Sequence, residues 1–99
     1  MVIGIIGLGY VGLTLAVAAA SKGIDVYGVE TNRHIKECLK ENHAHFYEPG
    51  LDSLIRRNNN RTLHIVESFS EDITYDAFII TVGTPLRAGE KTPNFEYIQ

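Results

Sequence analysis

Apolar runs rich in β-branched residues recur along the chain, each of them short and bounded by glycine or polar residues. They predict four strands, at residues 2–6, 25–30, 63–66 and 77–82. The first run, VIGII, carries no polar side chain, and the last, AFIITV, is the next strongest strand prediction. Such continuous apolar runs are typical of strands that are covered on both faces in a parallel sheet.

The segment after the first strand has the period of a helix. Leu13, Val17 and Ala20 fall on one stripe of a helix predicted at residues 10–22. Gly23 follows directly and suits the C-terminal cap, because glycine adopts the left-handed conformation at little cost. We therefore expect a slim, alanine-rich helix between the first two strands.

Shorter helices are predicted further along the chain. Asn32 can cap a helix that frays near residue 42, and Pro49 suits the first turn of the next helix. Ser70 can cap a brief helical turn that runs through Ile73. The last residues, TPNFEYIQ, look like a helix that has only begun, so we expect the chain to be part of a longer protein.

Strands and helices therefore alternate along a chain of 99 residues, which is enough for one small domain. Parallel strands joined by helices require right-handed crossovers. The pattern predicts an α/β fold with a doubly wound parallel sheet of about four strands in the order 3-2-1-4.

Composition and charge narrow the classes of partner. The chain is 44% hydrophobic and 21% charged with a net charge of −3, which gives no reason to expect nucleic acid or an anionic membrane as a partner. Cys38 is the single cysteine, so no internal disulfide can form, as suits a reducing compartment. The apolar start lacks a basic region and is interrupted by glycines, which argues against a signal peptide or a membrane span. We expect a cytoplasmic protein.

Three glycines lie where the first strand becomes the first helix, in the sequence GLGYVG. Gly7 would permit the tight turn, Gly9 would let a pyrophosphate approach the backbone, and Gly12 would let the helix pack closely on the strand. Tyr10 and Val11 would offer main-chain N–H groups at the positive end of the helix. This is the fingerprint of a Rossmann-type dinucleotide site, although glycines can also serve a tight turn alone.

Glu30 ends the second predicted strand, where a carboxylate can accept hydrogen bonds from both hydroxyls of an adenosine ribose. A carboxylate there would repel a 2′-phosphate, so the sequence favours NAD over NADP. Arg33 could instead bind a 2′-phosphate, but we expect it to cover the adenine or to reach the pyrophosphate. The alternative for Glu30 is a solvated strand end.

Residues 83–85, Gly-Thr-Pro, follow the fourth predicted strand. In the expected strand order this strand lies beside the first, at the point where ligands cross the sheet edge. Thr84 could hydrogen-bond a ribose or a phosphate there. The competing interpretation is a plain turn that ends the strand.

Other reactive side chains give weaker signals. Cys38 shares a helical stripe with apolar residues, so we expect a buried side chain rather than a nucleophile. His43 and His45 have poor spacing for zinc, and Glu48 is expected to be an acidic residue at a helix N-terminus. The basic stretch at residues 56–61 has no interleaved aromatic residues, which favours a solvated helix end over a nucleic-acid patch.

The segments IGLGYVGLTLA, VYGVETN, FYEPGLDSLI and ITVGTPL together resemble the UDP-glucose/GDP-mannose dehydrogenase family. The resemblance covers almost the whole chain, and EPGL and VGTP are its most specific parts. It implies that residues 1–99 are the N-terminal part of an NAD-binding domain. It also implies that the full-length enzyme oxidises the C6 hydroxyl of a nucleotide-linked sugar to a carboxylate while two NAD are reduced.

The resemblance also assigns residues. It implies that Gly7, Gly9 and Gly12 form the pyrophosphate turn and that Tyr10, Val11, Glu30 and Thr84 contact NAD, with Arg33 less closely matched. Two positions depart from the family pattern, because the family usually has aspartate at position 30 and many members have proline at position 14. The family's catalytic cysteine, lysine and aspartate and its sugar-binding domain come later than Gln99, so no catalytic residue is expected in this chain. Full-length members commonly form homodimers.

Two other classes of protein share the glycine turn. A regulatory NAD-sensing module would need neither the FYEPGL segment nor the Gly-Thr-Pro turn, and the same is true of hydroxyacid and phosphogluconate dehydrogenases. Both segments favour the nucleotide-sugar enzyme over these alternatives.

Overall fold

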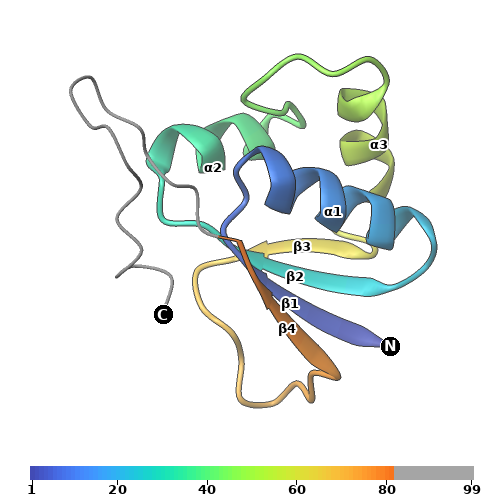
Figure 1. The fold of residues 1–99 in the computed structure, drawn as a ribbon, viewed down its shortest axis with the longest axis vertical. Coiled ribbons are helices and arrows are strands. Elements are labelled where there is room, and N and C mark those ends of the chain that lie inside the picture. The colour runs from blue at the N-terminus through green and yellow to red at the C-terminus, as the bar shows by residue number, and fades with distance from the viewer. Residues whose placement is uncertain (82–99) are drawn as a thin grey trace, which may run out of the picture.

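A computed structural model describes residues 1–81, and in it four strands form one parallel sheet in the order β3-β2-β1-β4 (Figure 1). The strands are β1 (Val2–Ile6), β2 (Asp25–Val29), β3 (Leu63–Val66) and β4 (Ala77–Ile80). The predicted α/β class, parallel pairing and strand order are confirmed. Since β4 pairs with β1 and not with β3, the chain reverses its direction of winding after β3.

The register brings the carboxyl ends of all four strands to one edge. Ile6 pairs with Val29 and Ile80, and Val29 pairs in turn with Val66. Whatever follows each strand therefore emerges at this edge, including the glycine turn. This placement is the geometry that ligand sites use in open α/β sheets.

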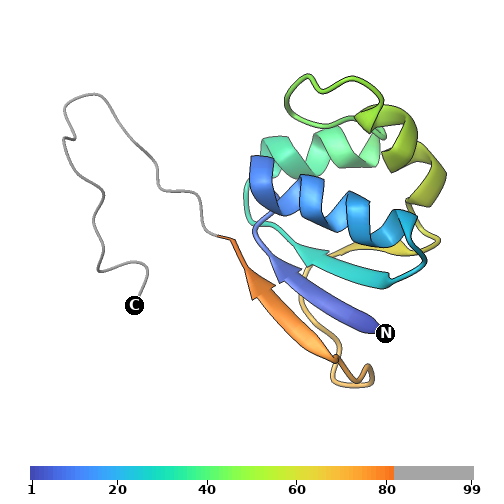
Figure 2. The same ribbon diagram turned by 45° about the vertical axis from the view of Figure 1, so that its right-hand side comes forward.

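Three helices cover one face of the sheet: α1 (Tyr10–Ser21), α2 (Arg33–Lys40) and α3 (Leu51–Asn58) (Figure 2). The predicted stripe of α1 points into the core, with Leu13, Val17 and Ala20 between 0% and 2% exposed. The largest fully buried side chains come from all the elements on this side: Ile5, Leu8, Leu13, Val17, Val26, Leu39, Ile55 and Leu63. Burial of this aliphatic layer is the main favourable term in the stability of the fold.

The opposite face of the sheet carries aromatic side chains. Tyr27 stacks on His64 with 4.5 Å between ring centroids, and Tyr75 meets Tyr27 edge-on. Phe69 packs against Phe78, which is still 52% exposed. Among residues 1–81, α1 packs over β1, β2 and β3 and leaves β4 at the rim of the sheet.

Left-handed residues close two of the helices. Gly23 (φ +90°) and the residue after it return their N–H groups to the last carbonyls of α1, as predicted for a glycine cap. Asn42 (φ +62°) does the same for α2, so the fraying expected near residue 42 is instead a closed cap. The predicted cap at Asn32 is confirmed, since its Oδ1 accepts from the Ile35 N–H at 3.1 Å.

Two predicted helical turns differ in the structure. Pro49 precedes α3 instead of starting it, because Gly50 takes a left-handed conformation (φ +82°) that breaks the helical path before Leu51. Ser70 caps only a hydrogen-bonded turn, where its hydroxyl accepts from the Asp72 N–H at 3.1 Å, and no helix forms. Both errors concern segments too short for periodicity to define.

Candidate functional site

The turn between β1 and α1 needs glycine at both ends for steric reasons. Gly7 has φ +94°, and a Cβ there would collide with the carbonyl oxygen of Thr81. A Cβ at Gly12 would collide with the Gly7 carbonyl oxygen and with the Thr81 hydroxyl. The predicted roles of Gly7 in the tight turn and of Gly12 in close helix–strand packing therefore have a direct structural cause.

Gly9 differs from Gly7 and Gly12, because a Cβ there would have no atom of residues 1–81 within 4 Å apart from those of its chain neighbours. Its backbone is extended (φ −70°), so nothing in the described part of the fold requires glycine at this position. Gly9 is the N-cap of α1, and no side chain of residues 1–81 caps the helix. The open space thus lies directly beside the unpaired first-turn amides and the positive end of the helix dipole.

Tyr10 and Val11 begin α1 with their side chains turned outward, at 58% and 62% exposed. Their main-chain N–H groups lie in the first turn of α1, directly after Gly9. This is the placement that the sequence predicted for an anion-binding helix N-terminus.

Glu30 follows β2 at the edge of the sheet and reaches back to the glycine turn. Its Oε1 accepts from the Leu8 N–H at 2.6 Å and its Oε2 accepts from the Asn32 N–H at 2.8 Å. Each carboxylate oxygen can accept more than one hydrogen bond, so the group is oriented while acceptor capacity remains. The two hydrogen bonds hold the half-buried carboxylate beside the turn.

Arg33 is the first residue of α2 and is exposed, close in sequence to Glu30. The structure brings it to the same edge of the sheet as the glycine turn, at the N-terminus of a second helix. Thr84, the remaining predicted contact, lies outside the described residues.

Thr81 is a residue of this site that the sequence did not single out. It follows β4, and its hydroxyl donates to the Gly7 carbonyl at 2.7 Å while its N–H donates to the Ile6 carbonyl at 2.8 Å. A threonine at the end of an apolar run indicates only a strand former, so the sequence carried no signal for this contact.

The loop at residues 42–50 folds against the start of α1. Phe46 packs on the Tyr10 ring with 4.8 Å between centroids, and the Tyr10 hydroxyl donates to Glu48 at 3.4 Å. Burial lowers the pKa of the His45 imidazole, although the Glu30 carboxylate raises it in part. The lowered pKa favours the neutral form of His45.

The other reactive side chains have structural partners. His43 Nδ1 lies 3.3 Å from Asp52 Oδ2, and among residues 1–81 no cluster of three metal-ligating side chains occurs. Cys38 is only partly buried, and its Sγ lies 3.8 Å from His34 Nε2, which corrects the expectation of a fully buried thiol. It lies at the fourth position after His34 on α2, where the two side chains share one face of the helix.

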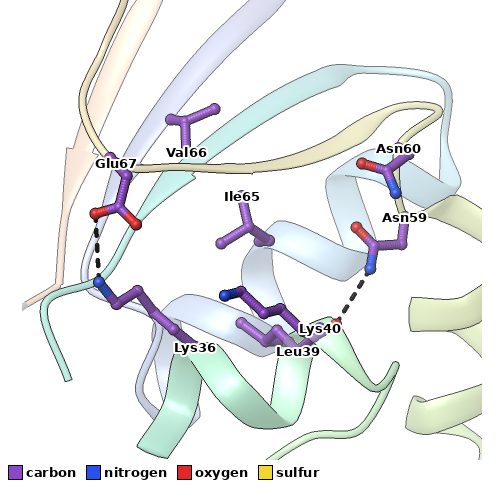
Figure 3. Close-up of a pocket in the computed structure, with 8 residues that line it drawn as sticks. All are labelled: Lys36, Leu39, Lys40, Asn59, Asn60, Ile65, Val66 and Glu67. Atoms are coloured by element: carbon purple, nitrogen blue, oxygen red, sulfur yellow. Dashed lines mark hydrogen bonds and ion pairs between the residues drawn. The ribbon is translucent and has the colours of Figure 1, made fainter. Parts of the chain in front are cut away.

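Two grooves are formed by other parts of the surface. One, of about 240 Å³, runs between α2 and β3, where Lys36 pairs with Glu67 at 3.3 Å (Figure 3). The other lies between α1 and α3 beside Tyr10 and Glu48. Neither is lined by Gly7, Gly9 or Glu30, so the candidate site is the open turn itself. No helix within the described range is long and apolar enough to cross a membrane.

The geometry suits a ligand with a diphosphate and a ribose. Main-chain amides at the start of α1 can bind an anion, the space beside Gly9 admits it, and the oriented Glu30 carboxylate can accept from vicinal hydroxyls. The arrangement therefore suits the binding and orientation of a dinucleotide.

Comparison with known proteins also indicates a dinucleotide-binding domain, and the match extends over the whole chain. The family model for the UDP-glucose/GDP-mannose dehydrogenase family, NAD binding domain, matches residues 1–99. The UDP-N-acetyl-D-mannosamine dehydrogenase of Campylobacter jejuni is 39% identical over 95 residues, which are 96% of this chain but 23% of that relative.

Solved structures of the same group have the same fold. A GDP-mannose dehydrogenase from Pseudomonas aeruginosa matches with a TM-score of 0.78 and 30% identity over 99% of this chain and 23% of its own. A UDP-glucose dehydrogenase from Pyrobaculum islandicum matches with a TM-score of 0.78 and 35% identity over 98% of this chain and 23% of its own. The chain thus spans less than a quarter of the length of these relatives. It belongs to the UDP-glucose/GDP-mannose dehydrogenase family and corresponds to the NAD-binding domain of that family.

Proposed function

We propose that the glycine turn and Glu30 bind NAD, and that the intact protein is an NAD-dependent nucleotide-sugar 6-dehydrogenase. Its reaction would oxidise the C6 hydroxyl of a UDP- or GDP-linked sugar to a carboxylate. Membership of the family and the names of the relatives support this activity, since each of those quoted above is a dehydrogenase of a nucleotide-linked sugar.

The single observation that carries the cofactor proposal is the contrast among the three glycines. Among residues 1–81, a Cβ at Gly7 or Gly12 would collide with other atoms of the protein, whereas a Cβ at Gly9 would meet none. The described part of the fold therefore gives no steric reason for glycine at position 9. A diphosphate that approaches the α1 amides supplies that reason.

Glu30 supports NAD in preference to NADP. Its carboxylate is fixed by two main-chain N–H groups and would repel a 2′-phosphate on the adenosine ribose. We propose that Arg33, exposed at the start of α2, covers the adenine or reaches the pyrophosphate. The contact with Thr84 remains a prediction.

In the intact enzyme the bound nicotinamide would accept hydride from the sugar. The residues of this chain would hold the cofactor: the α1 amides would bind the phosphates and Glu30 would grip the adenosine ribose. The catalytic groups and the sugar-binding domain would come from later residues, so we expect the 99-residue chain alone to be inactive. We also propose that the full-length protein binds a nucleotide sugar as its substrate, forms a homodimer and is located in the cytoplasm.

The first experiment changes the ribose carboxylate. Glu30→Ala in the intact protein should raise the Kd for NAD about 10- to 100-fold, because one charge-assisted interaction with the ribose is worth about 1.5–3 kcal/mol. Isothermal titration calorimetry with NAD and with NADP measures this change. Glu37→Ala, which removes an exposed glutamate from α2, is the matched control and should leave both affinities unchanged.

Unchanged NAD affinity in Glu30→Ala would remove the proposed ribose contact. The companion variant Arg33→Ala tests cofactor choice, and a selective loss of NADP binding would show that the arginine serves a 2′-phosphate. Activity is tested by incubating the intact protein with NAD and a panel of UDP- and GDP-linked sugars. Binding of NAD without reduction in the presence of any of them would favour a regulatory module over the enzyme.

A further inference from the structure

One peptide unit at the site, that between Gly7 and Leu8, is held from both ends. Its carbonyl oxygen accepts from the Thr81 hydroxyl at 2.7 Å, and its N–H donates to Glu30 Oε1 at 2.6 Å. The C=O and N–H of a trans peptide point in opposite directions, so one plane joins the two side chains. The residues after β2 and after β4 therefore act on the same rigid unit of the glycine turn.

Thr81 fills the space between the end of β1 and the first turn of α1. Its N–H is bound to the Ile6 carbonyl, and its hydroxyl lies where a Cβ at Gly12 would have to go. Its own carbonyl oxygen blocks a Cβ at Gly7. The hydroxyl is thus a donor in a crowded position, where the Gly7 carbonyl has little access to water as a replacement.

We propose that Thr81 is a positioning residue for the dinucleotide site. Its hydroxyl fixes the plane of the Gly7–Leu8 peptide, this plane aims the Leu8 N–H, and the Leu8 N–H orients the Glu30 carboxylate towards the ribose. The inference rests on the proposed function, because it takes NAD as the ligand of this turn. Thr81 itself needs no contact with the cofactor.

The test compares two substitutions in the intact protein. Thr81→Val keeps the shape and loses the hydroxyl, so the Kd for NAD should rise about 3- to 10-fold when the Gly7 carbonyl loses its donor. Thr81→Ser keeps the hydroxyl and should stay within about twofold of the parent. Calorimetric titration gives Kd, and a thermal melt of each variant is recorded beside it. A merely structural role would lower Tm and leave the Kd of the folded protein unchanged, which would overturn the proposal.

A double variant tests the route through Glu30. Once Glu30→Ala has removed the ribose carboxylate, adding Thr81→Val should raise Kd by a smaller factor than it does in the parent. Equal factors in both backgrounds would contradict the coupling. If Thr81→Val melts below the assay temperature, Thr81→Ala replaces it, because it also lacks the hydroxyl and is smaller.

The outcomes separate this inference from the proposed function. A parent protein that fails to bind NAD overturns the function itself. A parent that binds NAD, with Thr81→Val and Thr81→Ser binding equally well, overturns only the role of Thr81. In the intact enzyme the same role predicts a higher KM for NAD in Thr81→Val with little change in kcat.

Discussion

The glycine turn at residues 7–12 and the loop at residues 42–50 are both irregular, and they lie against each other at Tyr10. In the turn, the Gly7 N–H donates to the Val29 carbonyl at 2.9 Å, and the Glu30 and Thr81 side chains bind the peptide between Gly7 and Leu8. In the loop, Phe46 packs on Tyr10, and Asp52 accepts from the Ala44 N–H. The turn thus depends on the absence of side chains at its own glycines, whereas the loop depends on side chains of its own residues.

This difference predicts different responses to substitution. A side chain added at Gly7 or Gly12 should strongly lower the stability of the fold. A side chain added at Gly9 should strongly weaken the binding of NAD. Removing a group from the loop should have a small effect, because each of its contacts is partly exposed and replaceable by water.

Gly12→Ala should have the largest effect of these changes. The new Cβ would collide with the Gly7 carbonyl and the Thr81 hydroxyl, so α1 must move away from β1. Overpacking against a fixed backbone should lower the free energy of unfolding by about 3 kcal/mol, a large part of the stability of a small domain. Chemical denaturation of the variant and the parent measures it. A loss below about 1 kcal/mol would mean that the helix–strand packing is looser than the structure indicates.

Gly9→Val sharpens the contrast, because it adds a larger side chain three residues earlier. The fold should lose no more than about 1 kcal/mol, because the backbone is extended and a Cβ meets no atom of residues 1–81, so that the main loss is the preference of the N-cap for glycine over valine. The Kd for NAD should rise about 100-fold or more, because the side chain occupies the place of a phosphate that binds the α1 amides. Calorimetric titration and a denaturation curve on one sample test both halves. Normal NAD affinity in a folded Gly9→Val would show that the phosphates bind elsewhere.

The same contrast explains what the sequence could predict. The glycine turn was predictable because its motif lies within a few consecutive residues. The parallel sheet was predictable because each strand is a short apolar run that can be recognised by itself. The hydrogen bond between Leu8 and Glu30 joins residues that are 22 positions apart in the sequence. The hydrogen bond between Gly7 and Thr81 joins residues that are 74 positions apart. No local pattern records such a pairing, so the carboxylate was predicted and the residue that orients its partner peptide was not.

The errors have the same physical origin. Asn42 was expected at a frayed end, yet it closes α2 because asparagine tolerates the left-handed conformation that a cap requires. Pro49 was placed inside a helix because its fixed φ suits a first turn, but Gly50 interrupts the path. Both outcomes depend on one residue's backbone angle, which apolar periodicity does not report.

Asp52→Asn tests the loop side of the comparison and should have the smallest effect. Asp52 Oδ1 accepts from the Ala44 N–H at 2.9 Å, and Oδ2 lies 3.3 Å from His43, so this side chain ties the loop to the first turn of α3. The amide keeps the shape and loses the charge. The free energy of unfolding at neutral pH should fall by about 0.5–1 kcal/mol, near the lower end for a hydrogen bond because the group is half exposed. Asp72→Asn, at an exposed aspartate outside the loop, is the matched control.

The pH dependence gives this prediction its sign. The Ala44 N–H, followed by His43, lowers the pKa of the Asp52 carboxyl below its ordinary value of 3.8. A carboxyl with a lowered pKa stabilises the fold fully above 3.8, and this contribution is lost as the pH falls through the folded-state pKa. The stability difference between parent and Asp52→Asn should therefore be constant near neutrality and shrink in acid, while Asp72→Asn stays parallel to the parent. A difference that persists unchanged in acid would mean that the asparagine disturbs the shape of the loop, and that the charge of Asp52 does not hold it.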